Sequence, residues 1–258
     1  MLTKAKTLTG YSLQSPDGEL GKVKDFYFDD RYWAIRYLVA DTGEWLVSRQ
    51  VLISPHSLAG VFGSERNIAT TLTKDQIEHS PTFNRDKPVS RQFEREYSDF
   101  FGSPMYWGFP HNLGAKAESG KPGIKPSDPD LRSTHDVSGH HVEASDGEIG
   151  HVEDFLIDDE TWAIRYLIVN THDWLPGKKV LISPKWIERV SWREKQVVVD
   201  LTREAIEQAP EYRDAPLLTR DQEIALYRHY DRPGYWQAEA GGVDDFELSR
   251  AIPGRGPF

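Results

Sequence analysis

Two stretches of this sequence are nearly identical: DGELGKVKDFYFDDRYWAIRYL at residues 17–38 and DGEIGHVEDFLIDDETWAIRYL at residues 146–167. The second stretch begins 129 positions after the first, and the same offset places VLISP at 51–55 onto VLISP at 180–184. Self-similarity at one fixed offset is typical of a duplicated structural unit. Two copies of about 100 residues each indicate two domains rather than a solenoid.

The duplication predicts how the chain is divided. We expect a first repeat with C-terminal helices over residues 1–107 and a second over residues 136–236. Residues 108–135 between them are rich in Gly and Pro and lack an apolar period, which predicts a linker. Residues 237–258 are expected to form a tail.

The local patterns favour β-structure followed by helices. Gly in DGE permits a tight turn, and the runs that follow alternate as strands do. Five or six short strands in about 65 residues predict a small closed or half-closed barrel. The period then becomes helical over residues 201–210 and 218–230, with Thr202 and Thr219 as expected N-caps. The predicted class is therefore mainly β with helical appendages.

The composition excludes several classes of function. The chain has 258 residues and no cysteine, which excludes disulfides, thiolate metal sites and cysteine nucleophiles. The net charge of −10 repels phosphate backbones, so direct binding to nucleic acid is not expected. No apolar run approaches the roughly 20 residues needed to span a bilayer. With its short polar start, the chain is expected to be soluble and cytoplasmic.

The repeated blocks DGE-x-G-x-V-x-D, W-x-I-R-Y-L-x-V and V-L-I-S-P resemble the PRC-barrel family, over roughly residues 8–83 and 137–212. That family includes the cytoplasmic domain of the photosynthetic reaction centre H subunit and the C-terminal domain of the ribosome maturation factor RimM. The resemblance implies two small PRC-type β-barrels. It also implies a docking and assembly module without catalytic or cofactor-binding residues, and so not an enzyme.

The duplication itself suggests how the two units associate. Small barrels expose strand edges, and a two-fold pair covers them. Fusing two copies makes that association intramolecular. We therefore expect the repeats to pair with each other as a pseudo-two-fold pair within one chain. Further homodimerisation is left open.

Histidines are concentrated in the second repeat. The candidate metal ligands are His140, His141 and His151. Imidazoles at such spacing can bind Zn or Ni. Their counterparts in the first repeat are Tyr11, Ser12 and Lys22, so the feature is not part of the shared unit. We expect surface histidines here, with no metal site and no cofactor.

Two acidic pairs occur at the same place in both repeats, Asp29-Asp30 and Asp158-Asp159. Paired carboxylates can bind Ca²⁺ or act as acid and base. These pairs, however, lie where a hairpin turn is predicted, and adjacent strand residues face opposite sides. Turn and capping roles are therefore expected.

Arg36 and Arg165 lie within predicted strands and require acidic partners. We expect structural ion pairs with a partner such as Asp25 or Asp154, within the same barrel or across an interface. The alternative is that these arginines anchor a ligand.

Large aromatic residues are the main candidates for interaction, because Trp and Tyr combine contact area with a polar group. Each repeat ends in a Tyr-Trp pair, which either fastens the helices to their own barrel or contacts the other barrel or a partner. The candidate interaction residues are Trp33, Trp162, Arg36, Arg165, Tyr106, Trp107, Tyr235 and Trp236.

The leading functional hypothesis is a non-catalytic protein-interaction and assembly scaffold of a bacterial cell, with one or more protein partners. The first alternative is an accessory factor of RNA metabolism or ribosome assembly. The second is an accessory of photosynthetic or electron-transfer complexes, and the third is a small-molecule or metal-binding module.

Overall fold

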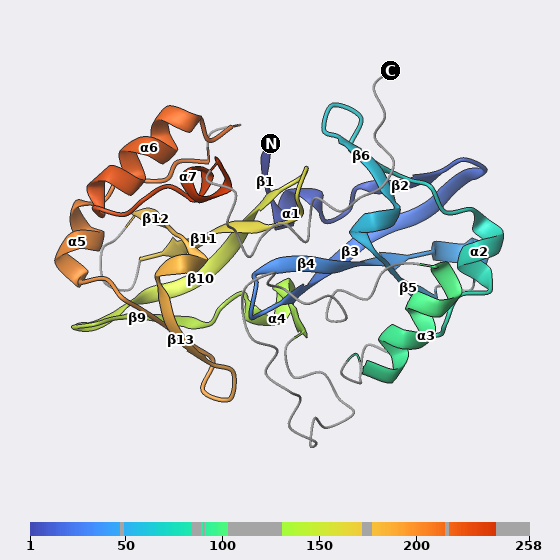
Figure 1. Ribbon diagram of the computed structural model, residues 1–258, viewed down its shortest axis with the longest axis horizontal. Helices are drawn as coiled ribbons and strands as arrows, with labels where there is room; N and C mark the ends of the chain where they lie inside the picture. The colour runs from blue at the N-terminus through green and yellow to red at the C-terminus, as the bar shows by residue number, and fades with distance from the viewer. Residues whose placement is uncertain are drawn as a thin grey trace. The chain divides into compact units, whose positions relative to one another are not determined.

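The computed structural model describes residues 1–46, 49–83, 89, 91–102, 131–171, 177–214 and 217–240 (Figure 1). The chain divides into two compact units. The C-terminal unit joins Met1–Leu8 to Ser133–Asp244, and the described part of the N-terminal unit runs from Thr9 to Arg132. This division differs from the linear one that the sequence predicts, because the first eight residues belong with the second repeat.

Each unit contains one seven-stranded sheet. The N-terminal unit has the order β5 (Gln50–Ile53), β4 (Ala34–Asp41), β3 (Gly18–Asp29), β2 (Ser12–Ser15), β7 (Asn67–Thr70), β6 (Leu58–Phe62), with β8 (Leu131–Ser133) beside β3. The C-terminal unit has the order β12 (Lys179–Ile182), β11 (Ile164–Asn170), β10 (Gly147–Asp158), β9 (His141–Ala144), β14 (Gln196–Val199), β13 (Ile187–Ser191), with β1 (Leu2–Lys4) beside β10. The two strand orders correspond position by position.

The class predicted from the sequence, mainly β with helical appendages, is confirmed. In the described residues, however, no pairing joins β5 to β6 or β12 to β13, so neither sheet closes into the predicted barrel. The bent strands β3 and β10 explain the half-closed form. Each is twelve residues long and pairs with one neighbour along its first half and another along its second, with bulges that increase the bend.

In each unit short helices lie between strands, and further helices follow β7 in one unit and β14 in the other. The N-terminal unit has η1 (Gly43–Leu46), η2 (Pro55–Ser57), α2 (Lys74–Glu78) and α3 (Arg91–Phe101). The C-terminal unit has α1 (Ala5–Leu8), α4 (Thr134–Val137), η3 (Pro184–Trp186), α5 (Arg203–Gln208), α6 (Arg220–His229) and α7 (Tyr235–Ala240). Thr202 caps α5 and Thr219 caps α6, so both predicted N-caps are confirmed. Both helices are shorter than their periodic sequence segments.

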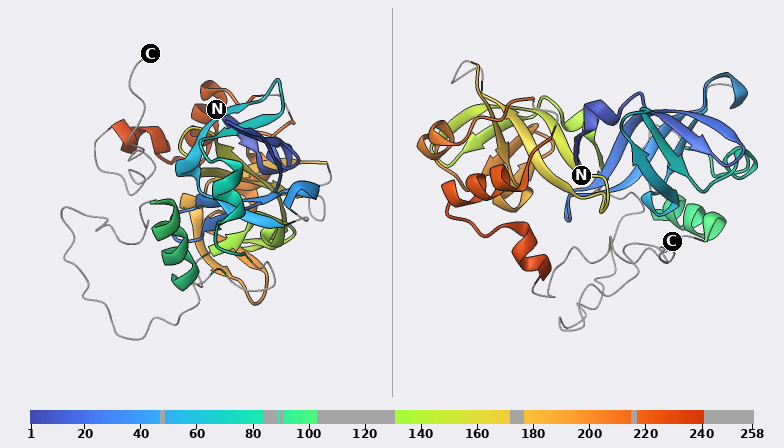
Figure 2. Two further views of the ribbon diagram at one scale, coloured as in Figure 1. Left: turned by 90° about the vertical axis from the view of Figure 1, so that its right-hand side faces the viewer. Right: turned by 90° about the horizontal axis from the view of Figure 1, so that it is seen from above.

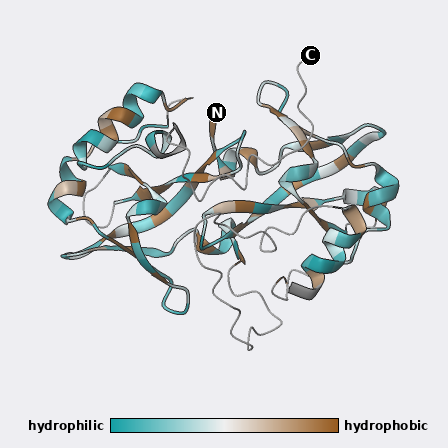
Figure 3. Cartoon of the chain, in the orientation of Figure 1, coloured by the Kyte–Doolittle hydropathy of each residue, from teal (hydrophilic) through white to brown (hydrophobic). Residues whose placement is uncertain are grey.

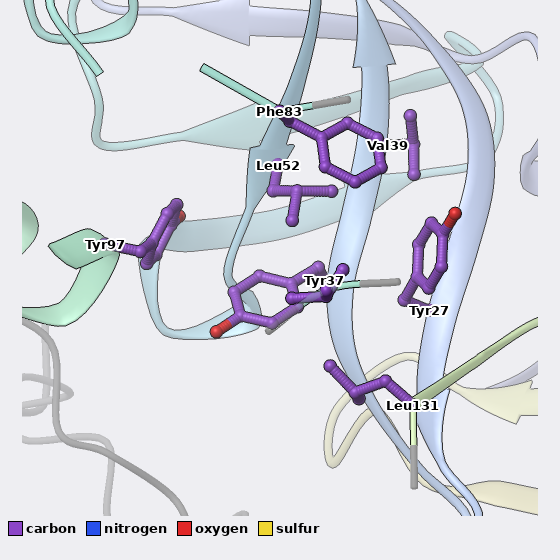
Figure 4. Packing of buried hydrophobic residues seen from close by; sticks show 8 residues of the cluster. Tyr27, Tyr37, Val39, Leu52, Phe83, Tyr97 and Leu131 are labelled. Carbon is purple, nitrogen blue, oxygen red and sulfur yellow. The ribbon is translucent and has the colours of Figure 1, made fainter. Parts of the chain in front are cut away.

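Each unit has its own core, in which a helix covers one face of the sheet. In the N-terminal unit Tyr97 of α3 packs edge-on against Tyr37 of β4, with ring centroids 5.2 Å apart. Figure 4 shows Val39, Leu52 and Phe83 in the same cluster. Figure 2 shows α3 and α6 lying beside the strands of their respective units. Hydrophobic residues lie along β4 and alternate with hydrophilic ones on α6, as a helix with one buried side requires (Figure 3).

Candidate functional site

The acidic pairs form the hairpin turns that the sequence predicts. Asp29 Oδ1 accepts hydrogen bonds from the amides of Arg31 and Tyr32, at 2.8 and 3.2 Å. Asp158 Oδ1 accepts from the amide of Glu160 at 3.1 Å. These are Asx turns, in which a side chain reproduces a backbone turn contact. A turn role for the first aspartate of each pair therefore follows from geometry in both repeats.

The turns place Trp33 and Trp162 in the left-handed backbone region, with φ of 53° and 60°. Each tryptophan amide donates to the carbonyl of the first aspartate, Asp29 or Asp158, at 2.7 Å. Both residues are buried, at 7% and 5% exposed, and the Trp33 ring stacks on Phe28. Trp33 and Trp162 therefore contribute to the cores of their own units. A part for them in binding a partner stays a prediction.

Arg36 and Arg165 form ion pairs with the aspartates of these turns. Arg36 Nη2 lies 3.5 Å from Asp29 Oδ2, and Arg165 Nη2 lies 3.0 Å from Asp158 Oδ2. Burial alone would raise the pKa of Asp158, but the Arg165 guanidinium and a hydrogen bond from Thr161 hold that pKa below its usual value.

The pairing expected between Arg165 and Asp154 is wrong, and the register explains why. Leu156 lies opposite Tyr166 and Ile157 opposite Ile164, so Arg165 is the extra residue of a β-bulge near the turn. Asp154 lies further along the strand, opposite Ile168. The arginine of the first repeat occupies the same bulge position, between Ile35 and Tyr37. The sequence pattern alone does not show a bulge.

Asp154 is instead part of the site that receives the first residues of the chain. Its Oδ1 accepts hydrogen bonds from the amides of Phe155 at 2.8 Å and Lys6 at 3.2 Å. The side chain is 3% exposed, and this burial raises the pKa of the Asp154 carboxyl. Asp25 in the first repeat accepts the equivalent bond from the amide of Phe26 at 2.8 Å.

A buried glutamate at the base of the helical appendage is the polar feature that sequence reasoning missed. Glu223 of α6 is 3% exposed and accepts hydrogen bonds from Tyr166 Oη at 2.8 Å and Tyr235 Oη at 3.0 Å. Arg220 Nη1 lies 2.9 Å from the other carboxylate oxygen. Burial and the nearby charge of Glu223 raise the pKa of Tyr166 well above its usual range, so the phenol remains a donor.

The first repeat contains a reduced version of the same cluster. Tyr37 Oη donates to Glu94 Oε1 at 3.3 Å, and Glu94 is 1% exposed. The pairs Tyr37–Glu94 and Tyr166–Glu223 are related by the 129-residue offset. The signal that could have found them is a glutamate recurring at equivalent positions of both helical segments.

The terminal Tyr-Trp pair of the second repeat fastens its helices to its own sheet. Tyr235 is buried, and the Arg165 guanidinium lies over its ring, 4.1 Å from the centroid. Arg220 lies over the ring of Trp236 at 4.4 Å, and that ring packs edge-on against Tyr227. The corresponding pair of the first repeat, Tyr106 and Trp107, lies outside the described residues.

The three candidate metal ligands are not gathered around one point. His140 is 5% exposed, with its ring 6.0 Å from that of Trp192. His141 is exposed, and its Nδ1 lies 2.7 Å from Glu148 Oε1. His151 is half-buried on β10, opposite His141 in the register. In the described part of the chain, no group of three or more His, Asp or Glu side chains is arranged to hold a metal ion.

The exposed faces of the two sheets differ more than their cores. A surface cleft of about 470 Å³ in the C-terminal unit is lined by His141, Glu143, Glu148, Glu194 and Gln196. At the positions of His141 and Glu143 the first repeat has Ser12 and Gln14. This face is therefore more acidic in the second repeat, and it carries an imidazole at position 141 where the first repeat has a hydroxyl.

Comparison with known proteins identifies the second repeat. The family model of the PRC-barrel domain matches residues 129–206, which confirms the resemblance for this part of the chain. The first repeat lies outside the matched range. No curated protein matches the chain. Among the residues that the structure describes, no helix is both long enough and apolar enough to cross a membrane.

Proposed function

We propose that this chain, whose residues 129–206 match the family model of the PRC-barrel domain, is a non-catalytic protein-interaction and assembly scaffold in the cytoplasm of a bacterial cell. The first repeat would act as a second module of the same kind, since its sheet has the same strand order. Its partners would be proteins rather than nucleic acids, because the chain carries a net charge of −10.

The main support for this proposal is that the polar residues shared by the repeats make contacts within their own unit. Arg165 pairs with Asp158 at 3.0 Å, and Tyr166 donates to Glu223 at 2.8 Å, all within one unit. Their counterparts in the first repeat make the same two contacts. The shared polar residues therefore maintain the fold, whereas catalysis requires polar groups aimed at a substrate. Ligand anchoring by Arg165 is disfavoured for the same reason.

Partner choice would then depend on surface positions at which the repeats differ. Position 141 is His where position 12 is Ser, and position 143 is Glu where position 14 is Gln. Duplicated modules can diverge at such positions without loss of stability, because surface substitutions usually cost little. A face that is more acidic in the second repeat than in the first would favour a basic segment of a protein partner.

Affinity purification of the tagged chain from its source cell tests this function, with and without nuclease and read by mass spectrometry. Recovery of one stoichiometric protein that survives nuclease is the expected result. Ribosomal proteins that disappear after nuclease treatment would support the ribosome-assembly alternative instead. Recovery of the bait alone would count against both.

Paired face variants make the experiment more specific. His141→Ser with Glu143→Gln gives the C-terminal unit the face of the first repeat, and Ser12→His with Gln14→Glu is the matched control. We expect only the first variant to lose the partner. If both variants lost the partner, or neither did, these positions would not determine which partner binds.

A further inference from the structure

The first residues of each repeat contribute to the sheet of the other repeat. Leu2, Thr3 and Lys4 of β1 pair with Asp158, Ile157 and Leu156 of β10, although residues 1–8 begin the first repeat. The equivalent strand one offset later is β8, and it pairs with β3 of the N-terminal unit. We call residues 1–8 the leader segment. The duplicated chain thus contains a reciprocal exchange of strands.

The leader segment has a specific site on the C-terminal unit. Ala5 and Leu8 of α1 are buried, at 3% and 0% exposed. The carboxylate of Asp154 accepts the amide of Lys6, and the carbonyl of Glu153 accepts the Lys6 ammonium at 2.6 Å. Lys4 Nζ lies 3.0 Å from Asp214 Oδ1. The site on the C-terminal unit therefore recognises the leader segment by strand pairing, by burial of two apolar side chains and by opposite charges.

The connection to the N-terminal unit is very short. Leu8 is the last residue assigned to the C-terminal unit, and the amide of Gly10 already donates to Val23 in the N-terminal unit at 2.8 Å. Gly10 has φ of +84°, a conformation that glycine adopts readily. At this crossing, therefore, only Thr9 lies between the leader segment and Gly10. Short hinges of this kind favour exchange between molecules, because extending the hinge directs the segment to another copy.

We propose that the leader segment is exchangeable and that a second copy of this chain can supply it to β10, so that two chains assemble by mutual strand exchange. The ion pair of Lys4 with Asp214 and the hydrogen bonds of Lys6 to Glu153 and Asp154 are made with residues of the C-terminal unit. A leader segment from another chain would make the same contacts. This inference is independent of the scaffold function proposed above.

Cross-linking between single-cysteine variants tests the proposal, since the natural chain has no cysteine. Lys4→Cys marks the leader segment and Asp214→Cys marks its site, and both side chains are partly exposed at 31% and 50%. The two variants are unfolded in urea, refolded together over a range of concentrations and treated with a short bis-maleimide. Lys4→Cys mixed with Asp75→Cys, an 84%-exposed position of the N-terminal unit, measures random cross-linking.

We expect the Lys4→Cys and Asp214→Cys mixture to give a cross-linked heterodimer severalfold above this control. Its yield should rise in proportion to chain concentration, with light scattering showing a two-chain mass. The double variant should cross-link within one chain at low concentration. If it does so while the mixture stays at the control level, exchange is confined to one molecule and the proposal is wrong. If the double variant does not cross-link at all, the leader segment does not dock at β10, and the proposal is equally wrong.

Discussion

At the scale of single residues, the glycine that ends the DGE-x-G block has no substitute. Gly150 has φ of +139°, and a Cβ added there would lie 2.0 Å from the carbonyl oxygen of Asn170. Gly21 has the same geometry against the carbonyl of Asp41. The close approach of two backbones, rather than a turn alone, therefore requires glycine at this position of both repeats.

Replacing Gly150 by alanine should lower the free energy of unfolding by about 3 kcal/mol or more, because the backbone must move to relieve the overlap. Gly139→Ala is the matched control, since Gly139 also has a positive φ (+90°) but no atom within 4 Å of an added Cβ. It should cost only about 1 kcal/mol from backbone conformation. Urea denaturation measures both losses, and equal losses would show that the contact with Asn170 is not limiting.

Two aspartates of β10 are expected to act on stability in opposite directions as pH changes. The pKa of Asp158 is lowered, so its ion pair stabilises the fold above pH 3.8, the usual value, and that contribution is lost as pH falls through the lowered pKa. The pKa of Asp154 is raised by burial. The contribution of protonated Asp154 to stability is therefore fully present below pH 3.8, and it is lost as pH rises through the raised pKa.

Asp158→Asn should cost about 3 kcal/mol at pH 7, because Arg165 is left buried without its charge partner. The difference from the natural chain should shrink as pH falls below 3.8, where Asp158 itself becomes protonated. Asp154→Asn keeps an oxygen that accepts the amides of Lys6 and Phe155, and should cost nothing at pH 7. Urea denaturation between pH 3 and 7 measures both. An Asp158→Asn loss that did not depend on pH would contradict the ion-pair assignment.

At this scale the sequence predicts that Arg165 is paired, but it does not predict with which aspartate. Arg165 was expected to be paired, and its pairing follows from charge and strand position alone. Its partner depends on the bulge between Leu156 and Ile157, which inserts the arginine next to the turn. Period-2 alternation contains no information about a bulge, so Asp154 was chosen in place of Asp158.

At the scale of elements, a tyrosine–glutamate pair joins each helical appendage to its sheet. Tyr166 of β11 donates to Glu223 of α6 at 2.8 Å, whereas Tyr37 donates to Glu94 at 3.3 Å. A hydrogen bond to a buried carboxylate stabilises more than a neutral one, and it weakens with distance. The appendage of the C-terminal unit is therefore the more firmly held of the two.

Tyr166→Phe should lower the free energy of unfolding by about 2 kcal/mol, because a buried charged acceptor loses one donor. Tyr37→Phe removes the longer bond and should cost about 1 kcal/mol or less. Thermal or urea unfolding of the two variants compares them directly. A larger loss for Tyr37→Phe would contradict this ranking.

The helices were predictable at their starts but not in their buried polar contacts. Thr202 and Thr219 are recognisable as caps because a hydroxyl residue precedes each helical period. Glu223 is a charged residue in the first turn of α6, where the helix dipole also favours an acid on the exposed side. Its burial depends on Tyr166, which lies 57 residues earlier on β11, and on Tyr235 of the following helix α7.

At the scale of the whole molecule, the duplication predicted two equivalent sheets, but it did not predict which residues complete them. A strand of three residues, such as β1, is too short to show a period of two. Residues 131–133 fell at the end of a segment predicted to be a linker. Pattern analysis therefore detects neither β1 nor β8. Without these two strands, the sequence predicts domains that follow one another along the chain.

The exchange predicts that mutations near one repeat loosen the other. Leu8→Ala should destabilise the C-terminal unit by about 3 kcal/mol, because Leu8 is fully buried in that unit. In the sequence, however, Leu8 lies at the start of the first repeat. Leu131→Ala should instead destabilise the N-terminal unit, where Leu131 packs in the cluster of Tyr27 and Tyr37 (Figure 4).

Hydrogen exchange read by mass spectrometry distinguishes the two variants, with β10 as the reporter of one unit and β3 as the reporter of the other. We expect Leu8→Ala to accelerate exchange mainly in β10, and Leu131→Ala mainly in β3. Each variant is the control of the other, because the same change is made in the equivalent segments 2–8 and 131–137 of the two repeats. If each mutation instead loosened the strand nearest to it in sequence, β1 and β8 would belong to the sheets of their own repeats. The exchanged topology would then be wrong.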